Sequence, residues 1–205
     1  MRPKSSLPAP KKKAPVPVRG QAAHEIRIIG GQWRRTPIKV LDKPGLRPTP
    51  DRVRETLKLR AFGLLKIPML FFVGPVVEEA SDEKIVVKIG LNRRTRNHVG
   101  SMYFGVLAAG ADCACGLLAM RLIDERAGGK VSLIFKDFKA EFLKRAEGDV
   151  LFTCTEGVEI LDAVKKSQES GERQSLPVNV IATVPSRLGD EPVARFVLTL
   201  SLKSQ

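Results

Sequence analysis

The sequence predicts an α+β domain in which one long buried helix is wrapped by an antiparallel sheet, preceded by a basic N-terminal extension. Residues 102–125 are apolar on nearly every side. A helix without a polar face must be covered on most sides, and a curved sheet can do this. Strand-like segments separated by short turns follow it, which favours antiparallel pairing. No internal repeat interrupts this order.

Charge and proline content divide the chain near residue 60. Residues 1–60 hold 16 Lys and Arg against 4 Asp and Glu, whereas residues 61–205 hold 19 and 18. Nine of the 14 prolines lie in the first 50 residues. A uniformly basic domain is therefore excluded. The body is long enough to bury roughly two-thirds of its unfolded surface.

The basic leader contains two parts. Residues 1–23 combine Pro, Ala, Ser and Lys with no acidic or aromatic residue, so we expect them to be disordered. Residues 24–40 hold two β-rich runs around Gly30 and Gly31, which predicts a hairpin. A Pro-rich loop then leads into a helix with Thr49 or Asp51 as its N-cap.

The body, residues 58–205, is expected to begin with a helix over 58–67 that ends before Pro68. Its β-branched runs predict strands and its glycine-containing polar runs predict loops. We expect strands over 70–79 and 84–91, a loop over 92–101, the long helix over 102–125, strands over 130–142 and 149–156, a helix over 158–170, and strands over 175–185 and 193–203.

Cysteine usage and hydropathy predict a soluble cytoplasmic protein. Cys113, Cys115 and Cys154 have neither metal-ligand spacing nor the density of a disulfide scaffold, so we interpret them as buried apolar groups and expect no metal. The first residues lack the apolar core of a secretory signal. The apolar run 67–77 is too short for a membrane span, and the run 102–123 contains charged residues.

Polar groups and glycines gather just before the long helix. Asn97 lies in the preceding loop, Gly100 lets the backbone turn, and Ser101 is the expected N-cap. The first free N–H groups, from Tyr103, Phe104 and Gly105, would point out of the helix start. Those donors and the helix dipole could polarise a carbonyl oxygen.

Asp112 is the one acidic residue within the apolar part of this helix. It lies nine residues after Tyr103, about 13 Å along the axis, so it cannot reach a carbonyl held at its own helix start. A second copy of the helix, antiparallel in a two-fold dimer, would supply the missing half. The alternative is that Asp112 is a structural carboxylate paired with a neighbour.

Residues 97–112, N-H-V-G-S-M-Y-F-G-V-L-A-A-G-A-D, resemble the motif of hotdog-fold acyl-CoA thioesterases of the PaaI type. Asn97, Gly100, Gly105 and Asp112 match without a gap. The segment F-K-D-F-K-A-E-F-L-K-R-A-E-G-D-V is similar to a strand-turn-strand segment of that superfamily, with Lys144 and Arg145 at its basic positions. The resemblance covers residues 58–203 and is closest to a poorly characterised branch of the superfamily.

The resemblance implies a dimeric or tetrameric hotdog protein that hydrolyses a thioester of coenzyme A or acyl carrier protein, with coenzyme A as part of the substrate and no other cofactor. Asp112 would be base or nucleophile, Asn97 would position water or thioester, and the region of Gly105 would polarise the carbonyl. Tyr103 and Phe104 replace the family's His-Gly pair. These bulkier side chains would narrow the substrate site. This favours an alternative, a non-catalytic protein that binds an acyl chain or a partner.

Three basic residues near the predicted site allow two interpretations. Arg96, Lys144 and Arg145 could bind phosphates of coenzyme A, or could be solvated loop residues. Tyr103, Phe104, Gly100 and Ser101 would line the substrate site.

Residues 24–57 resemble the start of bacterial small-subunit rRNA guanine-N2 methyltransferases. The carrying segments are I-R-I-I-G-G-Q-W-R-R and L-R-P-T-P-D-R-V-R-E-T-L. No Gly-rich methyl-donor motif and no catalytic motif of that family follows, so methyl transfer is not expected. The leader either binds RNA weakly or has no role. The RNA contacts would be Trp33 as a stacking face with Arg34, Arg35, Arg47, Arg52 and Arg54.

Overall fold

The computed structural model describes residues 24–29, 32–37 and 50–205, with side chains described from Arg52 onward. The disorder expected for residues 1–23 lies outside the described residues. Strands β1 (His24–Ile29) and β2 (Gln32–Pro37) pair antiparallel, with Ile29 opposite Gln32. The expected hairpin is therefore confirmed.

Helix α1 (Pro50–Lys66) is continuous and crosses the boundary that we expected between residues 57 and 58. The next expectation, a strand over 70–79, is wrong in its first half, because α2 (Pro68–Val73) occupies it and β3 begins only at Val76. Proline is favoured in the first turn of a helix, so Pro68 starts α2 as well as ending α1. Leu70 and Val73, three residues apart, form its buried face.

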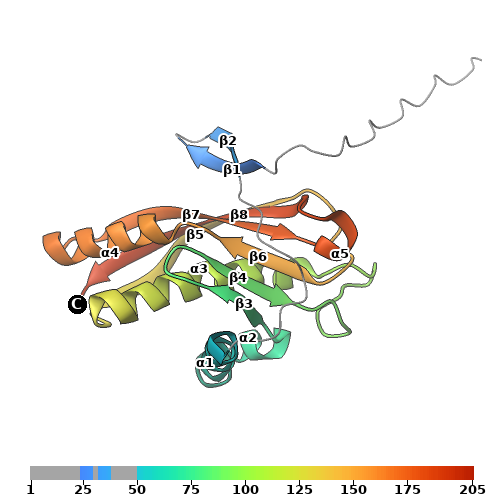
Figure 1. Cartoon of the computed structure of the whole chain (residues 1–205), viewed down its shortest axis with the longest axis horizontal. Helices are drawn as coiled ribbons and strands as arrows, with labels where there is room; N and C mark the ends of the chain where they lie inside the picture. The colour runs from blue at the N-terminus through green and yellow to red at the C-terminus, as the bar shows by residue number, and fades with distance from the viewer. Residues whose placement is uncertain (1–23, 30–31, 38–49) are drawn as a thin grey trace, which may run out of the picture.

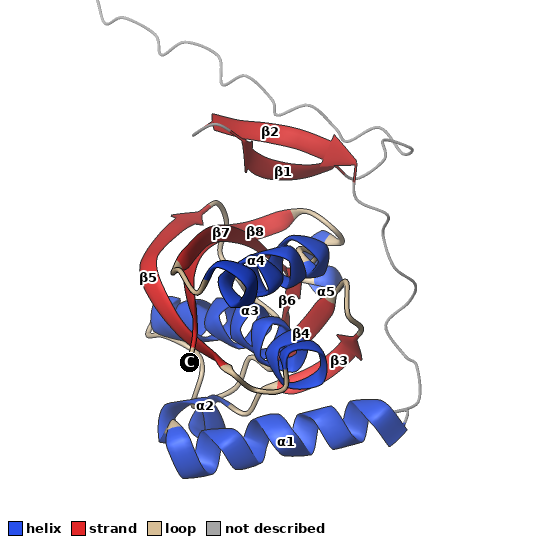
Figure 2. Cartoon of the chain, turned by 90° about the vertical axis from the view of Figure 1, so that its left-hand side faces the viewer, coloured by secondary structure: helices blue, strands red, loops and turns tan. Residues whose placement is uncertain are grey.

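The sheet contains six strands in the order β3-β4-β6-β7-β8-β5, and every neighbouring pair is antiparallel. The long helix α3 (Phe104–Ala127) lies inside the curl of this sheet, and α4 (Gly157–Ser170) lies beside it (Figures 1 and 2). The expected α+β architecture is thereby confirmed. The strands are β3 (Val76–Ala80), β4 (Ile85–Ile89), β5 (Val131–Phe142), β6 (Val150–Cys154), β7 (Gln174–Thr183) and β8 (Pro192–Ser204), and α5 (Pro185–Leu188) fills the last turn.

Helix α3 forms the centre of the core. Its residues Cys115, Leu118 and Leu122 are fully buried. A Cβ added at Gly110 would lie 2.3 Å from the Phe152 ring, so glycine is what allows the helix to approach β6 this closely. All three cysteines are free and buried, as expected.

By length and composition α3 is the one helix within the described residues that could cross a membrane. In this fold, however, 67% of its most apolar window is buried, as in the core helix of a soluble domain.

Candidate active site

The Asn97 side chain holds the loop that precedes α3. Its Oδ1 accepts hydrogen bonds from the backbone N–H groups of Val99 (3.0 Å) and Ser101 (3.2 Å), and its Nδ2 donates to Ser101 Oγ (3.1 Å). Gly100 has a φ of +83°, a conformation that favours glycine. Asn97 therefore fixes the loop through groups that sequence reasoning had assigned to water or substrate.

The cap of α3 differs from the expectation. Ser101 is not the N-cap: its side chain is bound to Asn97, and Tyr103 occupies the cap position without a side-chain cap hydrogen bond. The Tyr103 N–H is not free, because it donates to Thr95 O at 2.9 Å. Within the described residues, the N–H groups of Phe104 and Gly105 have no acceptor. The helix start therefore offers two donors where three were expected.

Aromatic rings cover this helix start. A Cβ at Gly105 would lie 2.6 Å from Tyr103 Cε1, so the space that the glycine leaves is filled by the Tyr103 ring. The rings of Tyr103 and Phe104 are 4.7 Å apart between centroids, and Phe142 lies 6.5 Å from Phe104. Tyr103 and Phe104 are nonetheless 47% and 60% exposed, so these rings lie at the surface and are not part of the core.

A cavity of about 370 Å³ lies at the helix start, and we call it the helix-start cavity. Arg145 lines it and donates to Val99 O, which ties it to the loop that Asn97 holds. Lys144 pairs with Glu191 at 2.5 Å. Arg96 is exposed and lies in the loop outside the lining, so it is not brought into the cavity. The lining residues are Asn97, His98, Ser101, Met102, Tyr103, Phe104, Leu107, Phe142, Lys144, Arg145 and Ala146.

Asp112 lies in a different cavity, of about 420 Å³, between α1, α2, α3 and β5; we call it the α1–α3 cavity. The carboxyl group is half-buried, and desolvation raises its pKa above the ordinary aspartate value. No hydrogen bond or ion pair to Asp112 is found among residues 50–205. A Cβ at Gly116 would lie 3.8 Å from Asp112 Oδ1, so this glycine keeps space in front of the carboxylate. One chain thus holds the two expected halves of the site apart.

Sequence reasoning missed the contribution of α1 to this cavity. Glu55, Leu59 and Phe62 of α1 line it. The spacing of Glu55 to Leu59 and of Leu59 to Phe62 places them on one helix face, which was the available signal. The sequence expectation divides α1 between two segments, 24–57 and 58–205, so it does not reveal this shared helix face.

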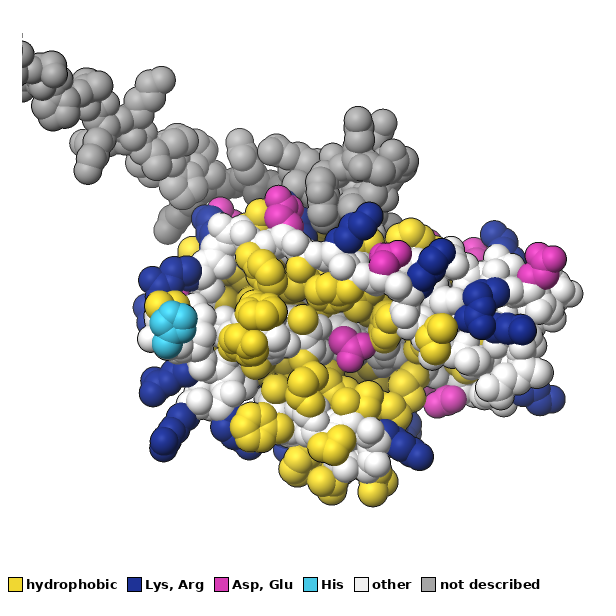
Figure 3. Space-filling view, turned by 180° about the vertical axis from the view of Figure 1, so that it is seen from behind, with side chains coloured by type: hydrophobic (Ala, Val, Ile, Leu, Met, Phe, Trp, Pro, Cys, Tyr) yellow, Lys and Arg dark blue, Asp and Glu magenta, His cyan; other side chains and the backbone are white. Residues whose placement is uncertain are grey.

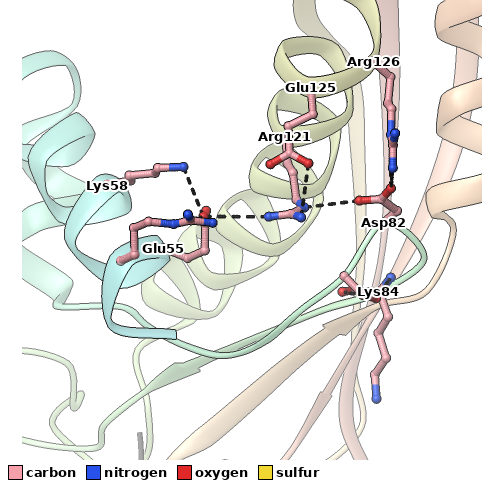
Figure 4. Close-up of polar contacts among 9 residues, drawn as sticks. Glu55, Lys58, Asp82, Lys84, Arg121, Glu125 and Arg126 are labelled. Atoms are coloured by element: carbon pink, nitrogen blue, oxygen red, sulfur yellow. Dashed lines mark hydrogen bonds and ion pairs between the residues drawn. The ribbon is translucent and has the colours of Figure 1, made fainter. Parts of the chain in front are cut away.

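An ion-pair network fixes α1 to α3 at this cavity (Figure 4). Glu55 Oε1, only 4% exposed as a residue, lies 3.1 Å from Lys58 Nζ and 3.7 Å from Arg121 Nη1. Arg121 in turn reaches Glu125 (3.1 Å) and Asp82 (3.5 Å), and Arg126 also pairs with Asp82. The hydrogen bond from Arg126 is the main reason that the pKa of Asp82 is lowered.

The expected RNA-binding residues are only partly described. Arg52 is not available as a solvent-facing contact, because its guanidinium pairs with Glu78 of β3. Arg54 is 60% exposed in its side chain and lies 3.5 Å from Glu55. Trp33, Arg34 and Arg35 are in β2, where side chains are not described, and Arg47 lies outside the described residues.

The described residues contain no group of three or more His, Cys, Asp or Glu side chains placed to hold a metal ion. The chemistry available at the two cavities is that of carboxylates, backbone N–H donors, hydroxyl groups and basic side chains.

The body is similar to solved thioesterase structures. One is a Pseudomonas aeruginosa protein of unknown function described as a "Probable Thioesterase": it is 22% identical, the match covers 78% of this chain and 100% of that one, and the TM-score is 0.62. A Haemophilus influenzae thioesterase is 14% identical over 70% of this chain and 88% of that one, with a TM-score of 0.53. These likenesses confirm the expected hotdog fold.

The N-terminal segment matches other proteins. Residues 26–66 match the family model "Conserved hypothetical protein 95". "Ribosomal RNA small subunit methyltransferase D" of Escherichia coli K12 is 73% identical over 33 residues, 16% of this chain and 17% of that protein. The Haemophilus influenzae protein of the same name is 58% identical over 36 residues, 18% of this chain and 19% of that protein. The chain thus spans about a sixth of the length of these curated relatives.

The body also matches a family model, and this match decides where the chain belongs. It extends over residues 56–201, most of the chain, and overlaps the N-terminal match on α1. By this match the chain belongs to the family described as "Domain of unknown function (DUF4442)".

Proposed function

We propose that this protein hydrolyses acyl thioesters at a site shared by two copies of the chain. Asp112 of one copy acts as base or nucleophile, and the Phe104 and Gly105 N–H groups of the other polarise the carbonyl. The observation that carries the proposal is the half-buried Asp112 carboxylate, which has no partner among residues 50–205 and faces a cavity. An unpaired carboxylate inside a protein is costly and needs a reason. The thioesterase fold of the body supports the same class of reaction.

The raised pKa of Asp112 suits proton transfer. A general base works best when its pKa lies near the working pH, and desolvation moves a carboxylate in that direction. As a base, Asp112 would take a proton from water while the water oxygen attacks the thioester carbon. The carbonyl electron pair would move to the oxygen held by the two N–H groups. Collapse of that intermediate breaks the C–S bond, and the thiolate receives the proton.

Strand β5 is the surface that we assign to the second copy. It forms one edge of the sheet and pairs with β8 on a single side. A long unpaired edge that exposes apolar side chains invites another strand. Ile134, Phe138 and Phe142 on β5 are 53%, 43% and 51% exposed, and Figure 3 shows apolar side chains gathered over one face of the molecule. A two-fold axis beside β5 would bring the helices of two copies close to each other.

Hydrolysis by wild type and Asp112→Asn tests the proposal. Acyl-CoA substrates with short, medium and long chains are assayed by thiol release. We expect Asp112→Asn to lose at least tenfold in kcat/KM, about 1.4 kcal/mol of barrier. Asp124→Asn is the matched control, because Asp124 lines the same cavity but is exposed. Equal rates in wild type and Asp112→Asn for every chain would contradict the proposal.

A second candidate, binding without turnover, is favoured by the Tyr103 ring that occupies the space over Gly105. A ring that stays in this position would keep a thioester carbonyl away from Gly105. Binding of acyl-CoA with no thiol release in wild type, together with hydrolysis in Tyr103→Ala, would select this candidate.

RNA binding by residues 1–60 remains a prediction that the match to the rRNA methyltransferases supports. Phosphate contacts weaken as salt rises, so a binding constant for rRNA fragments that falls steeply with salt is expected. Absent or salt-insensitive binding would remove this candidate.

A further inference from the structure

The α1–α3 cavity extends along one face of α3. The α3 residues in its lining occur in pairs one turn apart, from Asp112 at one end to Glu125 at the other. Thirteen residues of helix correspond to about 20 Å. The cavity is therefore lined along a length much greater than that of a single side chain. The α3 lining consists of Asp112, Cys113, Gly116, Leu117, Met120, Arg121, Asp124 and Glu125.

The middle of this cavity is apolar and its ends are polar. Leu59 and Phe62 of α1, with Ile67 and Leu70 around α2, form the wall opposite α3. Between Asp112 and Arg121, the α3 side of the lining contains no charged residue. A ligand that fits must be apolar along its length and reactive or polar at the Asp112 end.

The end away from Asp112 is closed by the ion pairs of Figure 4. Glu55 of α1 reaches across to Arg121 of α3, and Arg121 is held by Glu125 and Asp82 as well. Figure 1 shows α1 end-on below α3 and Figure 2 shows it lengthwise below α3, so these ion pairs join two helices that run in different directions. The length of an occupant is therefore limited at this end by charged groups that an apolar chain cannot replace.

We propose that the α1–α3 cavity binds the acyl chain of the substrate, with the thioester at Asp112 and the hydrocarbon extending toward Met120. The substrate class is then a medium- or long-chain acyl thioester, and Phe62 and Met120 determine the accepted length. This inference rests on the proposed function in one respect: it takes Asp112 as the reacting end. A cavity of about 420 Å³ lies within the usual range for small-molecule sites.

The inference also gives α1 a role. Leu59 and Phe62 lie in the stretch where the two family matches overlap, residues 56–66. The helix that begins in the methyltransferase-like segment is thus a wall of the acyl site.

The test measures kcat/KM for butanoyl-, octanoyl-, dodecanoyl- and hexadecanoyl-CoA. In wild type each added methylene is expected to raise kcat/KM about fourfold, which corresponds to about 0.8 kcal/mol, until the chain reaches the closed end. Met120→Phe fills the cavity and should lower kcat/KM for hexadecanoyl-CoA at least fivefold more than it lowers kcat/KM for butanoyl-CoA. Phe62→Ala widens it and should shift the preference toward longer chains.

The matched control is Leu65→Ala, on the same helix but 78% exposed and outside the lining. It should leave the chain-length profile unchanged. A profile that is flat in wild type, or that Met120→Phe and Phe62→Ala both leave unchanged, would overturn the inference.

A binding measurement separates this inference from the proposed function. Calorimetric titration of Asp112→Asn with the same four acyl-CoAs reports chain-length dependence without turnover. If wild type hydrolyses none of them but Kd still falls with chain length and responds to Met120→Phe, the cavity assignment stands and the hydrolase proposal fails. If hydrolysis depends on Asp112 but neither Kd nor kcat/KM depends on chain length, the cavity assignment fails alone.

Discussion

The two cavities along α3 differ in how their polar groups are used. At the helix start, the Asn97 side chain, Ser101 Oγ and Arg145 bond to the loop itself, and the first two N–H groups of α3, those of Phe104 and Gly105, have no acceptor among the described residues. In the α1–α3 cavity, the Asp112 carboxylate has no partner among residues 50–205 and lies at one end of an apolar stretch of the lining. One cavity offers donors for a developing negative charge, and the other offers a base.

In the proposed reaction, a single chain holds an incomplete site. Base and donors lie on the same helix, so their separation is set by the helical rise and no loop movement can shorten it. Two copies related by a two-fold axis would solve this problem, because each base could meet the donors of the other copy. The predictions below separate the roles of the two cavities.

The largest expected effect is recovery of activity when two inactive variants are mixed. Phe104→Pro removes one N–H donor at the first helical position, where proline is tolerated, and the extended Tyr103 before it accepts a following proline. We expect Phe104→Pro and Asp112→Asn each to lose at least tenfold in kcat/KM. After dissociation and reassociation together, statistical mixing should restore about a quarter of the wild-type rate, since half of the dimers carry one intact site of two.

Phe104→Ala is the control for this experiment, since it removes the ring but keeps the N–H group. If size measurements show that mixed dimers have formed but activity does not recover, then Asp112 and the N–H groups at the helix start do not act in the same reaction.

The next effect concerns the loop before α3. Asn97→Ala removes the side-chain hydrogen bonds of Asn97 to Val99 and Ser101 and should lower the free energy of unfolding by about 1–3 kcal/mol, as measured by urea denaturation. Asn97→Asp keeps the acceptor for the Val99 and Ser101 N–H groups and should retain more of the stability. His98→Ala, at an exposed neighbour, should change stability by less than about 0.5 kcal/mol. If Asn97→Ala is as stable as His98→Ala, the loop is held by other contacts.

A smaller effect is the pH dependence that Asp112 contributes. Its pKa is raised in the folded state, so the folded protein binds this proton more tightly than the unfolded chain. Stability should therefore fall as pH rises from the ordinary aspartate pKa through the raised value. Asp112→Asn should be more stable than wild type at neutral pH, and this advantage should disappear below the ordinary pKa. The acidic limb of kcat/KM should lie above the ordinary aspartate pKa, because the base must be ionised.

Urea titrations of both proteins across this pH range provide the check. If the stability advantage of Asp112→Asn over wild type instead grew toward acidic pH, the expected sign would be wrong and Asp112 would be paired in the folded state.

The smallest expected effects come from substituting the glycine beside Asp112 and the glycine at the helix start. A Cβ at Gly116 would make ordinary contacts with Phe135 and Asp112, so Gly116→Ala should raise the free energy of unfolding by roughly 0.5–1 kcal/mol through helix propensity. It should also slow hydrolysis by narrowing the space before the carboxylate. Gly105→Ala would displace the exposed Tyr103 ring instead and should change stability little. Thermal unfolding and kcat/KM of both variants distinguish the two glycines.

Much of the fold was predictable because it depends on local composition. The all-round apolar character of α3 required a surrounding sheet, and β-branched runs marked the strands. The failure at α2 has a physical cause: a short apolar run such as Leu-Phe-Phe-Val suits a strand or a buried helix equally, and a proline can end one helix or begin the next. Helix α1 lies so close to this segment that a Cβ at Gly63 would be 2.8 Å from the backbone nitrogen of Phe71. This packing favours the helical conformation of α2.

The sequence singled out the residues proposed for the site, but it did not give their hydrogen bonds. Asn97, Gly105 and Asp112 were identified from their spacing, and the helical rise already separated Asp112 from the helix start. Their hydrogen bonds could not be predicted, because Asn97 and Ser101 bond to each other only after the loop closes. The same holds for Tyr103, whose ring direction depends on the space at Gly105.

The order of residues therefore determined which elements form, where the long helix is buried, and that its single acidic residue lies too far from its own helix start. These properties follow from propensity, periodicity and the fixed rise of a helix. Packing between distant segments decided the rest. Glu55 pairs with Arg121, and Phe62 lines the same cavity as α3, only because α1 packs beside α3 in the folded chain. The spacing of these residues in the sequence does not indicate that packing.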